Sequence, residues 1–243
     1  MIGQPRSELL KQRSTQTTLY LFLAMFGLVA LAVTMHVLTL SSDDLASRAR
    51  QLEVFQVGRR AGMLFAGLAG AIAFTAEIRY GTIRPTFLVT PRRGPVIAAK
   101  LAISGLAGIV FGLLAEGLMA GDAAVAFAVR GIGNQLTSGD YLQLLAGGAA
   151  AAALWAAAGV GIGALVHNQV GALVGLCAWM FVIEATFESF LPSVGRLLPG
   201  GAGLALAGNS DELSVGVAAL LLVLYAAVAA VAGWRAILGR DVS

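Results

Sequence analysis

The stretch LYLFLAMFGLVALAVTMHVLTL, residues 19–40, is apolar along its length and contains no Asp, Glu, Lys or Arg. An α-helix of about 20 such residues spans the hydrocarbon core of a bilayer. The run is longer than the apolar core of a signal peptide, and no small-x-small cleavage pattern occurs in the sequence SSDDLASRAR that follows it. We therefore expect a retained transmembrane helix here, which sets the fold class of the chain.

The same apolar signal recurs along the sequence. Of 243 residues, 58% are hydrophobic and only 12% are charged, whereas soluble domains are about one quarter charged. We predict an all-α polytopic membrane protein that forms a single transmembrane domain, residues 1–243. Its six predicted spans are residues 18–40, 54–76, 101–121, 141–165, 169–188 and 213–234.

The Lys and Arg residues predict the orientation. If the N-terminus lies inside, six spans return the C-terminus to the same side, and more basic residues then lie in the inner segments than in the outer ones. This distribution follows the positive-inside rule and favours an N-in, C-in topology. The formal net charge of +3 is small, so the basic residues indicate membrane topology and not nucleic-acid binding.

The segments outside the spans have their own local signals. Residues 1–17 can form an N-terminal interfacial helix, and Thr137 to Asp140 fit a capping box at the start of the fourth span. Asn209 to Glu212 could cap the sixth span in a similar way. Residues 189–212 are apolar but interrupted by prolines and glycines, which predicts an outer loop or a re-entrant segment.

The segment EIRYGTIRPTFLVTPRRGPVIAAK, residues 77–100, lies between the second and third spans. Gly81 can end the preceding helix, and the hydroxyl of Thr82 can cap a new one. Pro91 then stops it, because the residue before a proline avoids the helical region. The result is a predicted cytoplasmic helix of about two turns, Ile83 to Val89, too short to be stable without a packing partner. An ordinary positively charged loop is the alternative.

Several catalytic and metal-binding patterns are missing from the sequence. There is no Walker A pattern, no H-E-x-x-H and no G-x-S-x-G. The histidines, His36 and His167, lie at the ends of different spans, and the single cysteine, Cys177, cannot form an intrachain disulfide. We therefore expect no catalytic residues and no metal site in this chain.

Three acidic residues lie within or near predicted spans, namely Glu116, Glu184 and Glu188. Because a charge in lipid is costly, such residues need a reason. They could line a polar path for a substrate, or they could form a structural polar network near the outer interface. In the second case Arg59, Arg60 and Arg196 are their candidate partners.

Small residues recur at four-residue spacing in several spans. Examples are the pairs Gly58/Gly62 and Gly171/Gly175, and Gly159, Gly161 and Gly163 form a similar cluster. Such residues allow helices to approach closely, either within one chain or between two copies.

The order of polar residues in the loop resembles the membrane subunits of type-2 ABC exporters, the permeases of many bacterial drug, antibiotic and lipid export systems. The N-terminal Glu8 and Lys11 also fit the opening helix of that family. The residues that carry the resemblance in the loop are Glu77, Arg79, Gly81, Thr82, Ile83, Arg84, Thr90, Pro91, Arg92, Arg93 and Lys100.

The resemblance implies a mechanism. The loop between spans two and three would be a coupling helix that docks on a separate ATPase subunit, which carries the Walker A site and binds ATP and Mg²⁺. Arg79 and Arg84 would pair with acidic groups of the ATPase, Phe87 would be an apolar anchor, and a basic partner would hold Glu77. The implied ATPase-binding residues are Glu77, Arg79, Gly81, Thr82, Ile83, Arg84 and Phe87.

The resemblance also implies an assembly and a location. Two permease copies, most simply a homodimer, would work with two ATPase copies in the bacterial inner membrane. Spans one and five line the dimer interface in that family, which would place Gly171, Gly175 and Cys177 near it. The substrate would be a hydrophobic or amphipathic drug, antibiotic, lipid or peptide. Two alternatives remain open: a cation-extruding permease of sodium type with the same architecture, and a membrane scaffold or sensor that transports nothing.

Overall fold

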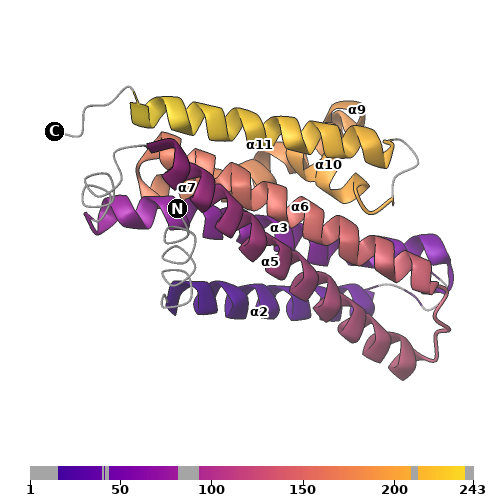
Figure 1. The fold of residues 1–243 in the computed structure, drawn as a ribbon. Helices are drawn as coiled ribbons and strands as arrows, with labels where there is room; N and C mark the ends of the chain where they lie inside the picture. Colours follow the sequence, from indigo (N-terminus) through magenta and orange to yellow (C-terminus); the bar gives the residue numbers. More distant parts are fainter. Residues whose placement is uncertain (1–15, 40, 42–43, 82–92, 209–212, 239–243) are drawn as a thin grey trace.

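The computed structural model describes residues 16–39, 41, 44–81, 93–208 and 213–238. These residues form a helical bundle without β-strands (Figure 1). Six helical segments of the described chain are long and apolar enough to cross a membrane. They are α2 (Gln16–Thr39), α3 (Arg48–Arg79), α5 (Arg93–Arg130), α6 (Ser138–Val166), the composite segment α7 (Gln169–Ala178), η2 (Trp179–Glu184) and α8 (Ala185–Phe190), and α11 (Val215–Leu238). The predicted all-α fold with six spans is confirmed.

The second and third spans are longer than predicted. The sequence predicts residues 54–76 and 101–121, whereas α3 and α5 extend over Arg48–Arg79 and Arg93–Arg130. Hydropathy detects only the part of a helix that matches the bilayer core. Helix α3 begins with the polar turns RARQLE before that part, whereas α5 continues after it with the mostly apolar residues DAAVAFAVR. At 1.5 Å per residue, the 32 residues of α3 make a helix of about 48 Å.

Helix α6 lies at the centre of the bundle because its surface is built from glycine and alanine. A Cβ atom added at Gly159 would lie 2.0 Å from the carbonyl oxygen of Gly67 in α3, and one at Gly112 in α5 would lie 2.4 Å from that of Gly148. A Cβ at Gly161 would meet the Ala229 carbonyl of α11 at 2.3 Å. The backbones of four helices therefore approach closely, as the small residues predict.

The two glycine pairs behave differently. Gly58 and Gly62 face α5, where added Cβ atoms would lie 2.0 Å from Met119 Cγ and 3.0 Å from Ala115 Cβ. Gly175 has no atom within 4 Å of an added Cβ. The first pair thus packs within the chain, and Gly175 leaves open space on the outside of α7.

Local signals at the helix ends appear as the sequence predicts. The Thr137 side chain accepts the Asp140 N–H at 3.3 Å, and Asp140 accepts the Thr137 N–H at 2.8 Å, which completes the capping box. Helix α3 ends at Arg79 with Tyr80 as its C-cap, and Gly81 follows with φ of +67°, a conformation that glycine adopts without strain. The predicted cap at Asn209 to Glu212 lies outside the described residues, but the Ser214 hydroxyl accepts the Val217 N–H at 3.4 Å.

The described part of segment 189–212 folds against the bundle. It contains two short helices, α9 (Pro192–Gly195) and α10 (Pro199–Ala205). Figure 1 shows both beside the beginning of α11, at the end where α3 and α6 also begin. We call this end of the bundle the α10 end, and we call the opposite end, where α3 finishes and α5 begins, the Glu77 end.

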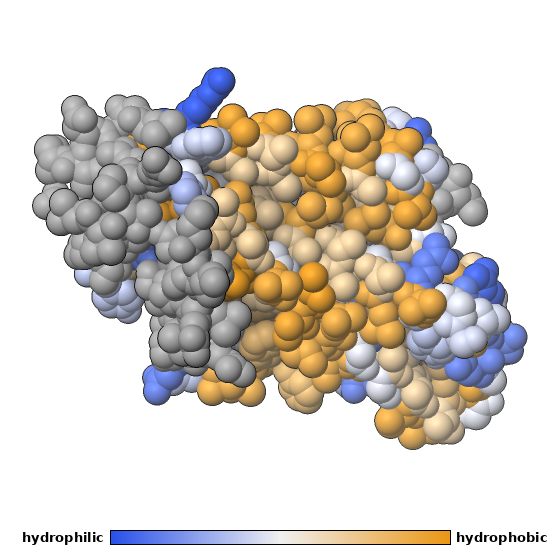
Figure 2. Space-filling view, viewed as in Figure 1, coloured by the Kyte–Doolittle hydropathy of each residue, from blue (hydrophilic) through white to orange (hydrophobic). Residues whose placement is uncertain are grey.

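The six segments differ in how much of their surface the bundle covers. In the most apolar window of α3, 72% of the residues are buried, compared with 17% in α2 and in α11. Figure 2 shows apolar side chains over most of the middle of one face, with hydrophilic ones gathered at the α10 end. Helix α3 is therefore a core helix, whereas α2 and α11 present apolar surface to the surroundings.

Candidate functional site

A buried ion pair joins α3 to α5 in the half of the bundle nearer the α10 end. Arg59 Nε lies 2.7 Å from Glu116 Oε1, and the two side chains are 0% and 1% exposed. Arg59 Nη1 also donates to the Leu204 carbonyl at 2.9 Å. Because removing charges from water is expensive, such a pair persists only where its geometry and hydrogen bonds compensate.

Glycine makes the room for this pair. A Cβ at Gly148 of α6 would lie 2.5 Å from Glu116 Cγ and 2.7 Å from its Oε1. Among the described residues, Arg59 Nη2 and Glu116 Oε2 have no hydrogen-bond partner. The pair is therefore enclosed by α3, α5 and α6 with little space to spare.

A second ion pair connects α3 to α8. Arg60 Nη2 contacts both carboxylate oxygens of Glu188, at 2.8 and 2.7 Å. Both side chains are 28% exposed, so this pair lies at the edge of the bundle. Consecutive arginines of α3 thus hold acids from two different helices.

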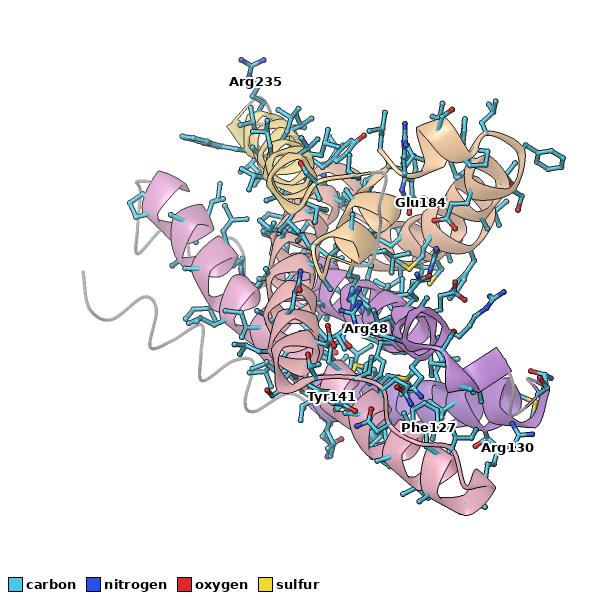
Figure 3. The ribbon with its side chains drawn as sticks, turned by 90° about the vertical axis from the view of Figure 1, so that its right-hand side faces the viewer. Arg48, Phe127, Arg130, Tyr141, Glu184 and Arg235 are labelled. Atoms are coloured by element: carbon cyan, nitrogen blue, oxygen red, sulfur yellow. The ribbon has the colours of Figure 1, made fainter. Side chains whose placement is uncertain are left out.

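The third acid, Glu184, terminates the π-helical turn η2. It is 0% exposed, and its Oε1 accepts the Gly200 N–H at 3.0 Å as well as the indole N–H of Trp179. Figure 3, which looks onto the α10 end, shows Glu184 beside the short helices of this region. Because π-helical turns are rare and widen the helix locally, η2 is the local feature from which this carboxylate reaches the α10 backbone.

The three acids therefore form a polar network within one copy of the chain. Arg59 and Arg60 bind Glu116 and Glu188, as the network interpretation predicts. Glu184 binds backbone and indole N–H groups instead. The described contacts give each acid a structural partner.

At the Glu77 end, a third ion pair again joins α3 to α5. Lys100 Nζ lies 2.9 Å from Glu77 Oε1, with the two side chains 2% and 8% exposed. The same Nζ donates to the Ala73 carbonyl at 2.9 Å. The basic partner that the resemblance implies for Glu77 is thus present, and it comes from the first turns of α5.

An apolar cluster includes Phe74 and Ile97, which precede Glu77 and Lys100 by three residues on their helices. Phe74, Ile97, Ala164 and Ile237 form a buried cluster contributed by α3, α5, α6 and α11. The last residues of α3 continue outward, and the Arg79 guanidinium lies 5.9 Å from the centre of the exposed Tyr80 ring. Thr82, Ile83, Arg84 and Phe87 lie outside the described residues, so the coupling helix stays a prediction.

Sequence reasoning missed the polar contacts that close the loops at the α10 end. The Gln51 side chain is 0% exposed; it donates to the carbonyls of Leu45 and Gly133, and it accepts the Gln135 N–H at 2.8 Å. Arg48 binds the capping residue Asp140. The labels in Figure 3 show Arg48 above Tyr141 in this view of the α10 end. Gln51 lies among the polar residues Arg48, Arg50 and Glu53 at the start of α3, so no local signal in the sequence distinguishes it.

A polar cavity of about 290 Å³ lies beside these contacts. Its lining includes Arg48, Glu53, Asp140 and Gln143. Arg48 and Asp140 already bind each other, and Glu53 binds Arg50 at 2.7 Å. Among the described residues, no group of three or more His, Cys, Asp or Glu side chains could hold a metal ion.

The fold defines the class of protein, a multi-pass α-helical membrane protein with six spans. No family model matches the sequence, and no curated protein matches it significantly. The resemblance to exporter permeases therefore depends on the loop and N-terminal residues named above.

Proposed function

We propose that the chain is the membrane subunit of an ABC exporter, which moves a hydrophobic or amphipathic substrate outward with ATP hydrolysed by a separate subunit. The observation that carries the proposal is the buried Glu77–Lys100 pair at the base of the loop. Glu77 and Lys100 are the first and last residues of the segment that resembles a coupling helix. A coupling element needs such a rigid base, because force applied to a loose loop would not reach the helices.

The packing of α3 and α5 supports the same proposal. The Glu77–Lys100 and Arg59–Glu116 pairs join these two helices at widely separated points. Between them, the closely packed glycine surfaces of α3, α5 and α6 leave no space for the helices to shift independently. Movement of the loop would therefore displace α3 and α5 together.

The polar network bears on the alternatives. A cation-extruding permease would need Glu116, Glu184 and Glu188 to face a central path, whereas these acids bind arginines and N–H groups of their own chain. Export of an uncharged or amphipathic substrate does not require these three acids to face a central path. The network favours an export function in which these acids are structural.

The proposed assembly contains a second permease copy, most simply identical, and an ATPase with a Walker A site that binds ATP and Mg²⁺. The chain itself would have no catalytic role, and the complex would lie in the bacterial inner membrane, with the Glu77 end in the cytoplasm. The open space beside Gly175 and the partly exposed Cys177 leave α7 free for contact with the second copy.

Purification in mild detergent from the native membrane tests the assignment. We expect a stoichiometric subunit with a Walker A motif to copurify. A chain that comes out alone, or with partners that lack a nucleotide site, would contradict the exporter assignment and favour a scaffold or sensor.

Charge reversal in the loop tests the coupling helix itself. We expect Arg84→Glu to abolish substrate-stimulated ATPase activity of the purified complex, because it would repel the acidic groups of the ATPase, while the permease stays folded in the membrane. Arg130→Glu, a reversal at the far end of α5, is the matched control and should retain the stimulation. Unchanged transport by the Arg84 variant would refute the docking role.

A further inference from the structure

Helix α10 has only 7 residues, PGGAGLA. Helices this short are unstable in isolation, and three glycines lower the helical propensity further. Pro199 begins the helix and Gly208 follows it with φ of +72°. Helix α10 therefore depends on contacts with the rest of the bundle.

Two buried charged side chains meet the two ends of α10. At its beginning, the Glu184 carboxylate accepts the Gly200 N–H at 3.0 Å. At its end, the Arg59 guanidinium donates to the Leu204 carbonyl at 2.9 Å. An anion at the N-terminus and a cation at the C-terminus are the arrangement that the helix dipole favours.

Two further polar contacts of the segment come from other helices. Trp155 Nε1 of α6 donates to the Pro199 carbonyl at 3.3 Å, and the Tyr225 hydroxyl of α11 donates to the Leu197 carbonyl at 3.3 Å. By contrast, the buried positions of α10 are Gly200, Ala202, Gly203 and Ala205. Such small residues bury little apolar side-chain area. Leu204 also packs partly buried against the core, so apolar and polar contacts together attach the helix.

Arg59 has a double role in this arrangement. Its Nε binds Glu116 of α5, and its Nη1 binds the Leu204 carbonyl of α10. A joint movement of α3 and α5 would therefore carry with it the guanidinium that holds α10. The attachment of α10 is in this way connected to the packing of the core helices.

We propose that α10 is a detachable element, held on the bundle at its two ends by Glu184 and Arg59, and that its release uncovers the interior between α3 and α6. We call these two contacts the α10 clamp. The clamp does not depend on the exporter assignment. The further claim that release of α10 opens an outward exit for substrate rests on the proposed function.

Cysteine accessibility tests the clamp. Cys177 is the only cysteine of the chain, so Cys177→Ser provides a clean background for Ala202→Cys on α10, at a position with 0% exposure. A membrane-impermeant maleimide added from the α10 side should label this protein slowly. We expect Glu184→Ala to raise the labelling rate at least fivefold, because it removes the contact with the Gly200 N–H.

Glu188→Ala is the matched control, since it also removes a carboxylate of the same segment but leaves the clamp in place. It should label like the parent, and gel filtration of all three proteins should give the same monodisperse peak. Equal labelling rates for the Glu184 and Glu188 variants would overturn the clamp. If the Glu184→Ala variant is not monodisperse, Glu184→Gln provides the test, because it keeps the size of the side chain and removes the negative charge at the beginning of α10. We expect its labelling rate to rise about twofold, and an unchanged rate would overturn the clamp.

A reversible crosslink tests the use of the element as an exit. A Cβ at Gly203 would lie 3.7 Å from Ala151 Cβ of α6, close to the separation in a disulfide. Only the flexible end of Met63 would have to move, since its Sδ lies 2.2 Å from that Cβ. We expect oxidised Ala151→Cys/Gly203→Cys protein, in the Cys177→Ser background, to lose transport and to regain it on reduction.

The outcomes of the two tests separate the claims. Transport that persists in the crosslinked protein overturns the exit but not the clamp. Faster labelling of the Glu184 variant in a protein that copurifies with no ATPase supports the clamp and refutes the exporter assignment on which the exit rests. Equal labelling overturns the clamp whatever the transport result.

Discussion

The two buried ion pairs between α3 and α5 have opposite polarity. At the α10 end, α3 contributes the cation Arg59 and α5 the anion Glu116; at the Glu77 end, α3 contributes the anion Glu77 and α5 the cation Lys100. Because the helices are antiparallel, sliding one along the other would break both pairs together. Helices packed through glycine and alanine have few side chains that fix their relative position, so we infer that the ion pairs set the register.

The spacing of the pairs matches a bilayer. The helical path from Arg59 to Glu77 is about 27 Å, and that from Lys100 to Glu116 is about 24 Å, at 1.5 Å per residue. The hydrocarbon core is about 30 Å thick. In a bilayer, each pair would lie near one limit of the apolar layer, where burial between helices replaces exposure to lipid.

The two pairs differ in their surroundings. Arg59 and Glu116 are 0% and 1% exposed, whereas Glu77 retains 8% exposure. The first pair is enclosed by three helices and shares a donor with α10, and the second lies at the base of a loop. Four substitutions test whether this difference governs stability and coupling.

The largest loss of stability should follow Glu116→Ala. It leaves Arg59 as an uncompensated buried charge, which costs about 3–5 kcal/mol. Thermal unfolding of the purified protein in detergent measures the effect. The double variant Arg59→Met/Glu116→Ala should recover part of the loss, because it removes the lone charge. A double variant less stable than the single one would show that the charge is not the cause.

Gly148→Ala should cost somewhat less, on the order of 1–3 kcal/mol, because its Cβ would lie 2.5 Å from Glu116 Cγ and would force the ion pair apart. Gly117→Ala on α5 is the matched control, since a Cβ there meets nothing within 4 Å. It should be neutral or slightly stabilising, as alanine is the better helix former. Equal effects of the two changes in the same unfolding assay would argue against steric crowding at the pair.

Lys100→Met should cost about 2 kcal/mol, since a charge-assisted hydrogen bond is lost but Glu77 can reach water near the membrane surface. Its main effect should be functional: we expect substrate-stimulated ATPase activity of the complex to fall about tenfold while the subunits still copurify. Lys100→Arg should retain most of the activity. Full stimulation of the ATPase activity in the Lys100→Met variant would show that coupling does not require this ion pair.

The smallest effect should come from Glu188→Gln. The Arg60–Glu188 pair is 28% exposed on each side, and exposed ion pairs contribute no more than about 1 kcal/mol. The melting temperature should stay within a few degrees of the parent, and it should depend weakly on salt. A loss as large as that of Glu116→Ala would mean that depth of burial does not distinguish the pairs.

Sequence by itself determined the six spans, because hydropathy is a local property summed over about 20 residues. It also determined the Thr137–Asp140 capping box and the turn at Gly81 just after the end of α3, which depend on a few neighbouring residues. The helix predicted from the loop residues Thr82 to Phe87 also depends on neighbouring residues. The docking of that helix on an ATPase subunit stays a prediction.

Only the tertiary structure decided the partners of the charges. Glu116 and Lys100 face Arg59 and Glu77 because of the register between α3 and α5, which glycine contacts with α6 help to set. The attachment of Glu184 to the α10 backbone needs both a π-helical turn and a folded segment 16 residues further on. A sequence shows which residues carry charge, whereas the pairing of those charges depends on how whole helices pack.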